Sequence, residues 1–350
     1  MEKLDNKLLA DYLSNHVVMV YPSMHEKFLH YEDMKNIYSQ ISNILSSNNI
    51  YQSYIVPEDY IDDMSFFKKL NPNIKIIKYN SNDIWIRDYY PKLYSSNEGL
   101  KKISFDFNGY GEKYPFENDN NYKYTLDMYN SHFNFKGYVI EGGNLEFSSK
   151  GVVITNKNSF IKNNQKYSCD KIIDKLMFLK NKMPFNELFT FEIEPIKGDD
   201  TNGHVDNLVR FIDDENLVYF ASTDKSYINY NVAKELKNQL NFIKKKSKII
   251  KNIFPIFHDD RDVFCGNDKY YPYSKLNFLI TANCVLFPSI TSNHLSILDD
   301  LRDLPILKKK YNINCEASLL ECGGLHCPVS YTHLRAHETR HDLVCRLLLE

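Results

Sequence analysis

The sequence predicts a protein of the α/β class. Short apolar runs of strand length alternate with segments whose apolar residues recur at helical spacing, and this rhythm is established within the first 80 residues. A chain of 350 residues has room for one large domain or two ordinary ones. Because no spacer rich in Pro, Gly or Ser divides it, we expect one continuous domain.

The hydrophobic pattern predicts the first elements in turn. Residues 17–20 form an apolar run that ends at Tyr21 and Pro22, which is typical of a buried strand followed by a loop. Apolar residues then recur at helical spacing over 26–47, which predicts a helix. The alternation continues with a strand at 52–56, a helix at 59–70 and a strand at 74–79.

Later segments carry similar signals. Residues 103–111 alternate in polarity and then turn through two glycines. Strands are expected at 138–147, 151–155 and 204–212, and helices at 169–180 and 231–250. Two apolar strands, at 276–280 and 284–287, flank Asn283, and Pro288 should end the second.

Charge and composition exclude several classes of function. The net charge of −2 offers no basic surface for nucleic acid, and no run of 18 apolar residues predicts a membrane-spanning helix. The N-terminus carries acidic residues where an export signal would have a basic run and an apolar stretch. We therefore expect a cytoplasmic protein whose seven cysteines are reduced thiols.

Residue usage changes abruptly after Cys327. Residues 1–327 are rich in Lys, Asn and Ile and contain four arginines, whereas the last 23 residues contain three arginines and no Lys, Asn or Ile. We interpret residues 328–350 as a foreign-looking tail, such as vector or adapter DNA translated in frame, and residues 1–327 as the native domain. A native amphipathic C-terminal helix is the alternative.

A candidate nucleophile ends this native part. Gly323 and Gly324 precede His326 and Cys327, and they leave the backbone open to the close approach of a flat substrate. A nucleophilic cysteine needs His and carboxylate partners elsewhere in the chain. Cys322 and Cys327 could instead form half of a zinc site, but the sequence offers no second pair of ligands at suitable spacing.

Two acidic segments could supply carboxylates. Asp83 and Asp88 flank Trp85, the only Trp of the chain, and two acids beside an aromatic ring could bind a flat cation. Glu141 follows an apolar run directly, and a carboxylate buried there would need a cationic partner. The ordinary alternatives are surface charges around a half-buried Trp and a carboxylate at a surface turn.

The candidate histidine is His204. From a strand, His204 and Asp206 would point the same way, and the acid would raise the basicity of the imidazole. A single His is more often structural than catalytic, but this one follows an acidic loop that glycines interrupt.

Five motifs together resemble those of the agmatine deiminases, which are grouped with the bacterial peptidylarginine deiminases among the guanidine-modifying enzymes. The resemblance covers about residues 17–327 and rests on the order and spacing of the motifs. They are Asn82-Asp83-x-Trp85-x-Arg87-Asp88, Phe105-x-Phe107-Asn108-Gly109-x-Gly111, Glu141-Gly142-Gly143, Gly198-Asp199-Asp200-Thr201-x-x-His204-x-Asp206 and Gly323-Gly324-x-His326-Cys327.

The resemblance implies a fold and a reaction. The fold is the pentein-type propeller, in which five ββαβ units surround a pseudo-fivefold axis with the active site at its centre. The reaction is hydrolysis of a guanidinium, a planar cation whose N–H donors carboxylates bind in pairs. It implies no metal and no organic cofactor.

The resemblance also assigns roles to residues. Asp88 and Asp206 would bind the guanidinium beside Trp85, and Cys327 would attack its central carbon. His204 would protonate the leaving ammonia and then deprotonate the water that hydrolyses the thiouronium intermediate. Glu141 would support the histidine or the substrate nitrogens, and His326 would be structural because neighbours in an extended segment diverge. Further substrate-binding candidates are Asp83, Asp200, Asn283 and Gly324.

Three departures from the family pattern stand out. Tyr110 replaces the usual Trp of an Asn-x-Trp-Gly motif, and Gln165-Lys166-Tyr167 lies where the family has Arg-Asn-Pro. Pro328 and the tail replace the short polar segment that closes the last strand. If the Cys327 loop is misplaced as a result, an error of about 1 Å could cost roughly a hundredfold in rate.

We therefore expect a cytoplasmic agmatine deiminase that releases ammonia and N-carbamoylputrescine. Its partner would be a small cationic guanidino substrate rather than nucleic acid or membrane, with a homo-oligomer left open. One alternative is a deiminase of free or peptidyl arginine, which would need a cationic or amide-rich rim for the substrate's other end. The other is an inactive homologue that binds guanidinium without chemistry. An amidinotransferase fits the chemistry but not the motifs.

Overall fold

The structure is a computed structural model. It describes residues 7–332 apart from 23–28, 62–63, 66–67, 69–70, 72–73, 97–98, 124–131, 166–170, 172–173, 176, 179–184 and 267. Of the predicted helix at 169–180, residues 171, 174–175 and 177–178 are described and are helical, and the other seven lie outside the described residues. Of the helix predicted at 59–70, half lies outside the described residues, and the described part includes η2 (Glu58–Tyr60).

The first sheet confirms the predicted strands of the N-terminal region. It has the order β19-β2-β3-β4, with β2 (His16–Val20), β3 (Tyr51–Val56) and β4 (Ile74–Lys78) in parallel. Helix α1 (Tyr31–Ser47) connects β2 to β3. It begins later than predicted, and it buries its apolar stripe of Met34, Ile37, Tyr38, Ile41 and Leu45.

The first residues of the predicted tail complete this sheet. Strand β19 (Val329–Thr332) runs antiparallel to β2, so that Val329 lies opposite Met19 and Thr332 opposite His16. The segment after Cys327 therefore closes the sheet as a regular strand. Residues 333–350 lie outside the described part, and the foreign origin of the tail stays a prediction.

Four further sheets of three or four strands follow among the described residues. Each repeats one pattern, an antiparallel pair whose second strand takes a parallel partner, as β19, β2 and β3 also do. The strands are β1 (Lys7–Leu8), β5 (Lys92–Ser96), β6 (Gly99–Asp106) and β7 (His132–Val139); β8 (Glu146–Phe147), β9 (Val152–Asn156) and β10 (Glu187–Phe191); β11 (Val209–Phe211), β12 (Asn216–Ala221) and β13 (Asn252–Phe257); and β16 (Leu279–Ile280), β17 (Cys284–Ser289) and β18 (Lys309–Asn314).

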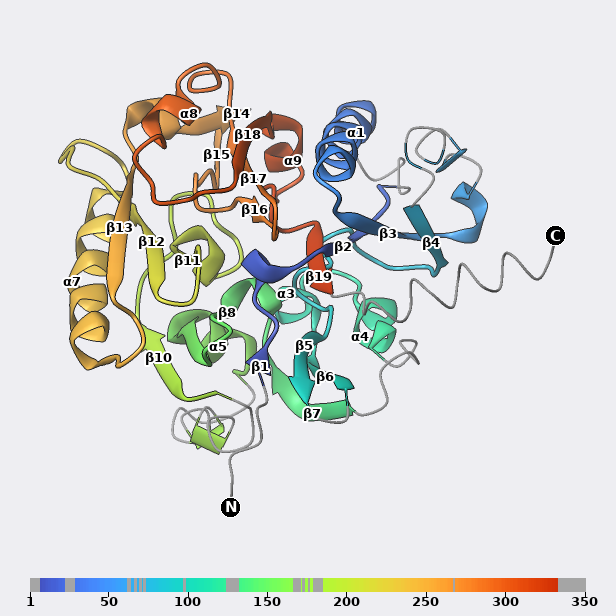
Figure 1. Cartoon of the computed structure of the whole chain (residues 1–350), viewed down its shortest axis with the longest axis horizontal. Coiled ribbons are helices and arrows are strands. Elements are labelled where there is room, and N and C mark those ends of the chain that lie inside the picture. The colour runs from blue at the N-terminus through green and yellow to red at the C-terminus, as the bar shows by residue number, and fades with distance from the viewer. Residues whose placement is uncertain are drawn as a thin grey trace.

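Helices and a hairpin join these sheets. Helix α7 (Tyr230–Lys246) confirms the helix predicted at 231–250, although it ends four residues earlier, and it lies at the rim of the molecule outside β12 and β13 (Figure 1). Its last turn carries three lysines, whose positive charges are stabilised by the negative C-terminal end of the helix dipole. The others are α3 (Gly109–Glu112), α4 (Glu117–Tyr122), α5 (Lys157–Asn163), α8 (Ile297–Asp300) and α9 (Glu316–Leu320), with the β14 (Phe264–Gly266) and β15 (Lys269–Tyr271) hairpin.

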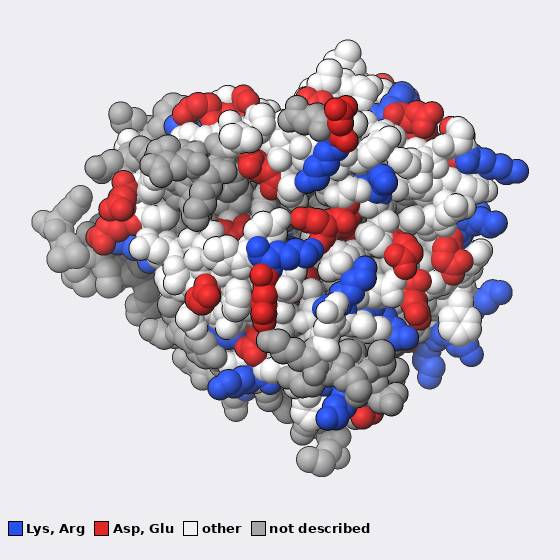
Figure 2. All heavy atoms as spheres, turned by 180° about the vertical axis from the view of Figure 1, so that it is seen from behind, with Lys and Arg blue, Asp and Glu red and all other residues white. Residues whose placement is uncertain are grey.

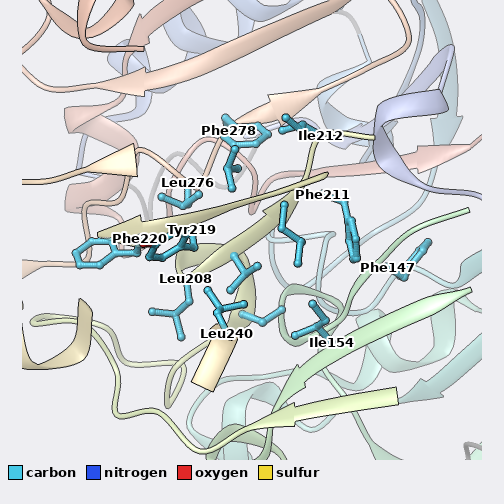
Figure 3. Packing of buried hydrophobic residues seen from close by; sticks show 14 of the residues in the cluster. Phe147, Ile154, Leu208, Phe211, Ile212, Tyr219, Phe220, Leu240, Leu276 and Phe278 are labelled. Atoms are coloured by element: carbon cyan, nitrogen blue, oxygen red, sulfur yellow. The ribbon is translucent and has the colours of Figure 1, made fainter. Parts of the chain in front are cut away.

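Two large apolar clusters form the core. One joins β8, β9, β11, β12 and α7, and Figure 3 shows its packing around Phe211 and Leu240. The other surrounds β2, β3 and α1 and includes residues of the segments 84–90 and 107–122. On the face in Figure 2, acidic and basic side chains are interspersed. None of the described helices is both long and apolar enough to cross a membrane.

Three predicted strands need correction. The strand expected at 138–147 is interrupted, because β7 ends at Val139 and a 3₁₀ turn at Gly142–Asn144 precedes β8. Pro288 lies inside β17 rather than after it; at this position the strand is paired only with β18, through Ile313, so one side needs no N–H. Residues 204–212 are not one strand, because Val205–Asn207 form a 3₁₀ turn before β11. In this turn a side chain rather than a neighbouring strand bonds to the backbone: Ser274 Oγ donates to the Asn207 carbonyl at 2.8 Å.

Candidate active site

The loop that carries Cys327 is held by its contacts with protein side chains. It leaves α9 through a turn in which the Gly323 amide donates to the Ser318 carbonyl at 3.0 Å. A Cβ on Gly323 would lie 2.2 Å from the Trp85 ring, and one on Gly324 would lie 2.3 Å from Asn277 Oδ1. Both glycines are therefore required by the packing of the protein itself, which the sequence had suggested only for a substrate.

The Cys327 thiol faces a buried amide. Its Sγ lies 3.7 Å from Asn277 Oδ1, and the Arg87 amide donates to the Cys327 carbonyl at 3.1 Å. Burial raises the pKa of the thiol well above its ordinary value, and the nearby carboxylates of Asp206 and Asp88 raise it further. The thiol is accordingly protonated in the absence of a ligand.

His204 is buried between carboxylates. Its Nε2 lies 2.6 Å from Glu141 Oε2, and its Nδ1 lies 3.7 Å from Asp88 Oδ1. Burial alone would lower the pKa of the imidazole, but Asp88, Glu141 and Asp206 together raise it to about 10. His204 is therefore an imidazolium at neutral pH, which suits a general acid.

The two carboxylates beside His204 are held by defined donors. Asp88 accepts from the Gly143 amide at 2.7 Å and from the Tyr110 hydroxyl at 2.9 Å. Glu141 Oε2 accepts from Asn163 Nδ2 at 2.6 Å as well as from His204. The second oxygen of Glu141, Oε1, is buried without a protein partner.

Asp206 joins this cluster to a second one. Its Oδ2 accepts from His326 Nδ1 at 2.8 Å, whereas its Oδ1 is buried without a protein partner. Burial opposes the charge on Asp206, but the bond to His326 and the charges of His204 and Arg210 lower the pKa of the carboxyl overall. Asp206 is thus a charged carboxylate with one oxygen to spare.

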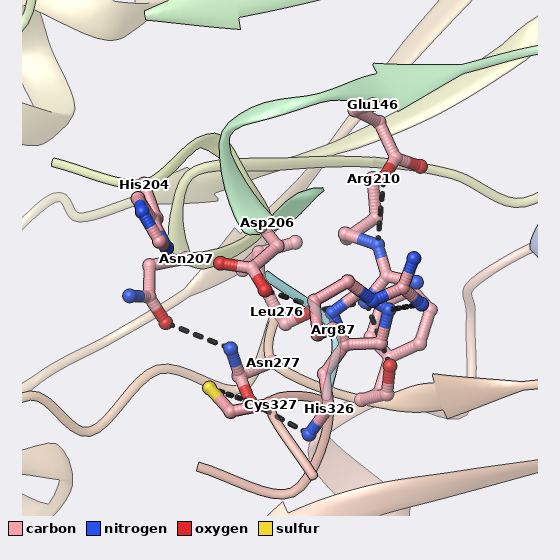
Figure 4. A network of polar contacts seen from close by, with 12 residues as sticks. Arg87, Glu146, His204, Asp206, Asn207, Arg210, Leu276, Asn277, His326 and Cys327 are labelled. Carbon is pink, nitrogen blue, oxygen red and sulfur yellow. Dashed lines mark hydrogen bonds and ion pairs between the residues drawn. The ribbon is translucent and has the colours of Figure 1, made fainter. Parts of the chain in front are cut away.

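Behind Asp206 lies a buried ionic network, shown in Figure 4. Arg87 pairs with Asp11 at 2.8 Å and contacts His326 Nε2, and Arg210 pairs with Glu146 at 3.1 Å and with Asp11 at 3.2 Å. Burial and the two guanidinium groups lower the pKa of His326 to about 4. The same Nε2 lies 3.0 Å from Asp11 Oδ2, so the ring contacts carboxylates through both of its nitrogens.

Asp83, Trp85 and Asp200 lie next to the loop of Cys327. Asp83 Oδ1 accepts from the Trp85 amide at 2.8 Å, and Trp85 packs against Gly323. Burial, with smaller contributions from Asp88 and Asp200, raises the pKa of the half-buried Asp83 carboxyl to about 7. The segment is a series of turns, in one of which the Asp88 amide donates to the Trp85 carbonyl at 3.1 Å.

The structure thus brings together Cys327, His204, Asp88, Asp206 and Glu141 in one contact network, with Trp85, Asp83, Asp200 and Gly324 beside it. Asn283 is not part of it. That residue lies in the turn between β16 and β17, and its amide donates to the Asn48 carbonyl at the end of α1. The prediction that Asn283 binds substrate is not supported.

The sequence missed four residues of this network, namely Asp11, Asn163, Arg210 as a partner of Glu146, and Asn277. Asn277 accepts from the His326 amide at 2.8 Å and donates to Asn207 at 3.1 Å. The available signal was a polar residue inside the apolar run 276–280, where a buried amide needs partners. No comparable signal singled out Asp11, whose partners are about 76 to 315 residues distant in the chain.

His326 and Cys327 do diverge, as predicted, although the segment is a turn rather than a strand. The His326 ring contacts Asp206 and Asp11, and the Cys327 sulfur contacts Asn277.

Comparison with known proteins identifies a family and a fold. The family model described as Porphyromonas-type peptidyl-arginine deiminase matches residues 12–330. Agmatine deiminase of Stutzerimonas stutzeri is 23% identical over 198 residues, which are 51% of this chain and 48% of that protein. In sequence, the chain thus spans about half the length of this curated relative.

Solved structures match over nearly their whole length. A variant of C. jejuni agmatine deiminase with substrate bound superposes with a TM-score of 0.79 at 23% identity, covering 94% of this chain and 97% of that one. Agmatine deiminase of Enterococcus faecalis superposes with a TM-score of 0.82 at 18% identity, covering 95% and 97%. The mixed α/β fold is therefore the one found in these deiminase structures.

Proposed function

Since the chain belongs to the Porphyromonas-type peptidyl-arginine deiminase family, we propose that it is an agmatine deiminase, which hydrolyses the guanidinium of agmatine to N-carbamoylputrescine and ammonia. One observation carries this proposal. A partly exposed thiol, a buried imidazolium and three buried carboxylates form one group, and two of those carboxylates keep an oxygen without a protein partner.

The two unpartnered oxygens suit a guanidinium. Buried polar atoms are almost always hydrogen-bonded, so an unpartnered carboxylate oxygen indicates a missing donor. The atoms concerned are Glu141 Oε1 and Asp206 Oδ1, which are both buried. A guanidinium presents several N–H donors in one plane and could satisfy both. Trp85, packed against the loop of Cys327, would then face the flat cation.

The charges of the group favour a reaction that starts only when the substrate binds. Asp88 and Asp206 contribute to keeping the Cys327 thiol protonated in the empty site. A guanidinium bound between them would offset their charge, so the pKa of the thiol would fall. Because His204 is already protonated, the thiol would release its proton to solvent water, and the thiolate would form beside its target. We propose that the thiolate then attacks the central carbon and forms a covalent bond to it.

His204 would act twice. As an imidazolium it would first donate a proton to the departing nitrogen, which leaves as ammonia. The neutral imidazole would then take a proton from the water that hydrolyses the thiouronium intermediate. Glu141, at 2.6 Å from Nε2, would hold the ring in place and stabilise its charged form.

Agmatine is favoured over arginine by the pairing of the cations. A substrate with a carboxylate would need a free cation near the site. Each arginine of the described residues is engaged: Arg87 and Arg210 in the buried network, Arg261 with Asp259 and Arg302 with Asp299. Recognition of a substrate carboxylate would therefore need a lysine such as Lys269, whose Nζ lies 3.8 Å from Cys322 Sγ. Asp83 and Asp200 instead offer acidic groups for the amine of agmatine.

The test is turnover of agmatine by the full chain. Purified protein is incubated with agmatine, and ammonia and the ureido product are measured against a Cys327→Ala variant. Cys322→Ala, which removes a thiol from the same loop, is the matched control and should keep activity. Absence of turnover above the Cys327→Ala background would refute the proposal. Arginine and a blocked arginine peptide, assayed in parallel, test the alternative substrates.

An inactive homologue is the other alternative. The pairing of β19 with β2 and the bond from the Val329 amide to the His326 carbonyl, at 3.1 Å, support a well-held loop. Mass spectrometry of a quenched reaction decides this point, because a guanidinium-binding protein without chemistry would carry no adduct on Cys327.

We also propose that the five sheets stand as blades around one axis. Their shared strand pattern supports this arrangement, and so does the convergence on one site of residues from segments near β5, β8, β11 and β19.

A further inference from the structure

The turn that carries Tyr110 has an unusual handedness. Four consecutive residues, Gly109, Tyr110, Gly111 and Glu112, have φ values of 59°, 60°, 85° and 68°. The Glu112 amide donates to the Asn108 carbonyl at 2.7 Å and the Lys113 amide to the Gly109 carbonyl at 3.0 Å. These bonds close one left-handed helical turn, a conformation that L-residues other than Gly adopt only at a cost.

Tyr110 and Glu112 bear that cost, so the surrounding contacts must impose the conformation. A Cβ on Gly109 would lie 2.2 Å from the Tyr114 carbonyl oxygen, so the turn closes tightly on itself. Asn108 stabilises the turn from both ends: its Oδ1 accepts from the Gly111 amide at 3.0 Å, and its Nδ2 donates to the Asn163 carbonyl at 3.2 Å.

The strained turn places the Tyr110 side chain next to Asp88 and His204. The Tyr110 ring is buried and packs edge-on against the Phe107 ring, with 5.3 Å between the ring centroids. Its centroid lies 6.4 Å from that of the His204 ring. Its hydroxyl donates to Asp88 Oδ2 at 2.9 Å. Burial and the surrounding carboxylates raise the pKa of Tyr110 well above its ordinary value, so the hydroxyl remains a donor.

We propose that Tyr110 is a positioning residue for the reaction proposed above, whose hydroxyl fixes the carboxylate of Asp88, and that the left-handed turn is retained to hold that hydroxyl in place. The Gly143 amide holds Oδ1 of the same carboxylate. With both oxygens held, Asp88 keeps one orientation toward His204 and toward the substrate. The proposal rests on the proposed function for its role in catalysis, but not for its structural part.

The same turn also reaches the other partner of His204. Asn163, which accepts from Asn108 through its carbonyl, donates through its side chain to Glu141. One strained turn is therefore tied to both carboxylates that contact His204. This arrangement explains why a short loop would keep two non-glycine residues in a left-handed conformation.

The test uses Tyr110→Phe, which removes only the hydroxyl. Without it Asp88 Oδ2 loses a donor, so the carboxylate is less well held and can turn away from His204, which weakens its attraction for the imidazolium. The groups that face His204 are Asp88, Glu141, Asp206 and Asp199, and of these only Asp88 bonds to Tyr110. We expect the pKa of His204 to fall by roughly one unit in the variant.

This titration is followed by NMR of protein labelled at histidine, with His204→Gln assigning one signal among the eleven histidines. Tyr114→Phe is the matched control, because it removes a hydroxyl from the same loop that faces Asp200 rather than Asp88. Its His204 signal should titrate as in the parent protein. An unchanged titration in folded Tyr110→Phe would overturn the proposal.

Kinetics add a second readout. With agmatine, Tyr110→Phe should lower kcat at least as much as it raises KM, by roughly tenfold in kcat/KM. A loss of folding is excluded by the thermal unfolding midpoint. If the parent protein does not turn over agmatine, the proposed function fails, but the His204 titration still decides whether Tyr110 holds Asp88.

Discussion

His204 and His326 are both almost fully buried, at 2% and 1% exposure, and both lie near Asp206, yet their protonation differs. Around His204 the nearest charges are carboxylates, and the pKa rises to about 10. Around His326 the carboxylates of Asp206 and Asp11 raise the pKa, but burial and the guanidinium groups of Arg210 and Arg87 outweigh them, and the pKa falls to about 4. Burial lowers the pKa of both imidazoles, so the presence of the two guanidinium groups beside only one of them separates their states.

The comparison separates catalysis from structure. His326 is adjacent to Cys327 in the sequence, but it is neutral and engaged by Asp206 and Arg87. His204 is 123 residues away in the chain, the difference between 327 and 204, and it carries the proton that a general acid needs. Two regions of similar residue types therefore have different tasks.

The largest expected effect is on kcat/KM, and it tests the different roles of the two histidines directly. His204→Gln removes the proton donor and should lower kcat/KM by roughly a thousandfold while the protein stays folded. His326→Gln should lower the thermal unfolding midpoint but change kcat/KM by less than about tenfold. Steady-state kinetics on both variants check this. Equal losses of activity in two folded variants would contradict the division of roles.

The next prediction concerns the buried ion pairs beside His326 and their contribution to the free energy of unfolding. Arg87→Met leaves Asp11 with one guanidinium fewer in a buried site and should destabilise the protein by about 3 kcal/mol. The control is Arg302→Met, because the pair of Arg302 and Asp299 is exposed, at 73% and 71%, and should matter little. Denaturant unfolding measures both. Similar losses for the two variants would contradict the importance of the buried network.

Opposite pH windows sharpen the contrast further. The pKa of His204 is raised from 6.5 to about 10, so its contribution to stability is fully present below pH 6.5 and is lost as the pH rises toward 10. The pKa of His326 is lowered from 6.5 to about 4, so its contribution is present above pH 6.5 and is lost as the pH falls toward 4.

Each window is visible as a difference between the parent protein and a variant. His204→Gln should flatten the alkaline fall in unfolding free energy, by up to about 1.4 kcal/mol per pH unit, and His326→Gln should flatten the acid fall. Denaturant unfolding between pH 4 and pH 10 tests this. If both variants changed the unfolding free energy only at alkaline pH, or only at acid pH, the assignment of the two pKa shifts to His204 and His326 would be refuted.

The smallest effect concerns a residue outside both regions. Asn283→Ala removes one hydrogen bond to the Asn48 carbonyl and should cost about 1 kcal/mol of stability, with KM for agmatine unchanged. A clear rise in KM would return Asn283 to the substrate site. Asn277→Ala is the contrasting variant, since it removes the amide beside Cys327 and should lower activity.

Local patterns in the chain predicted much of the secondary structure. The apolar run 17–20 became β2, the spacing over 231–250 became α7, and the run 52–56 became β3. Local patterns failed where side chains replaced strand pairing. Ser274 donates to the carbonyl of Asn207 in the turn Val205–Asn207, and Thr201 accepts from the His204 amide just before it. Residues 109–112 form a left-handed turn.

The sequence by itself determined which residue types the site contains, because Cys327, His204, Asp88, Asp206 and Glu141 stand in motifs of recognisable order. Only the tertiary structure decided their states. The charge on His204 and the neutrality of His326 depend on Asp88, Arg87 and Arg210, which reach the site from segments far apart in the chain. A pKa depends on the summed field of spatial neighbours, and adjacency in sequence does not determine which neighbours those are.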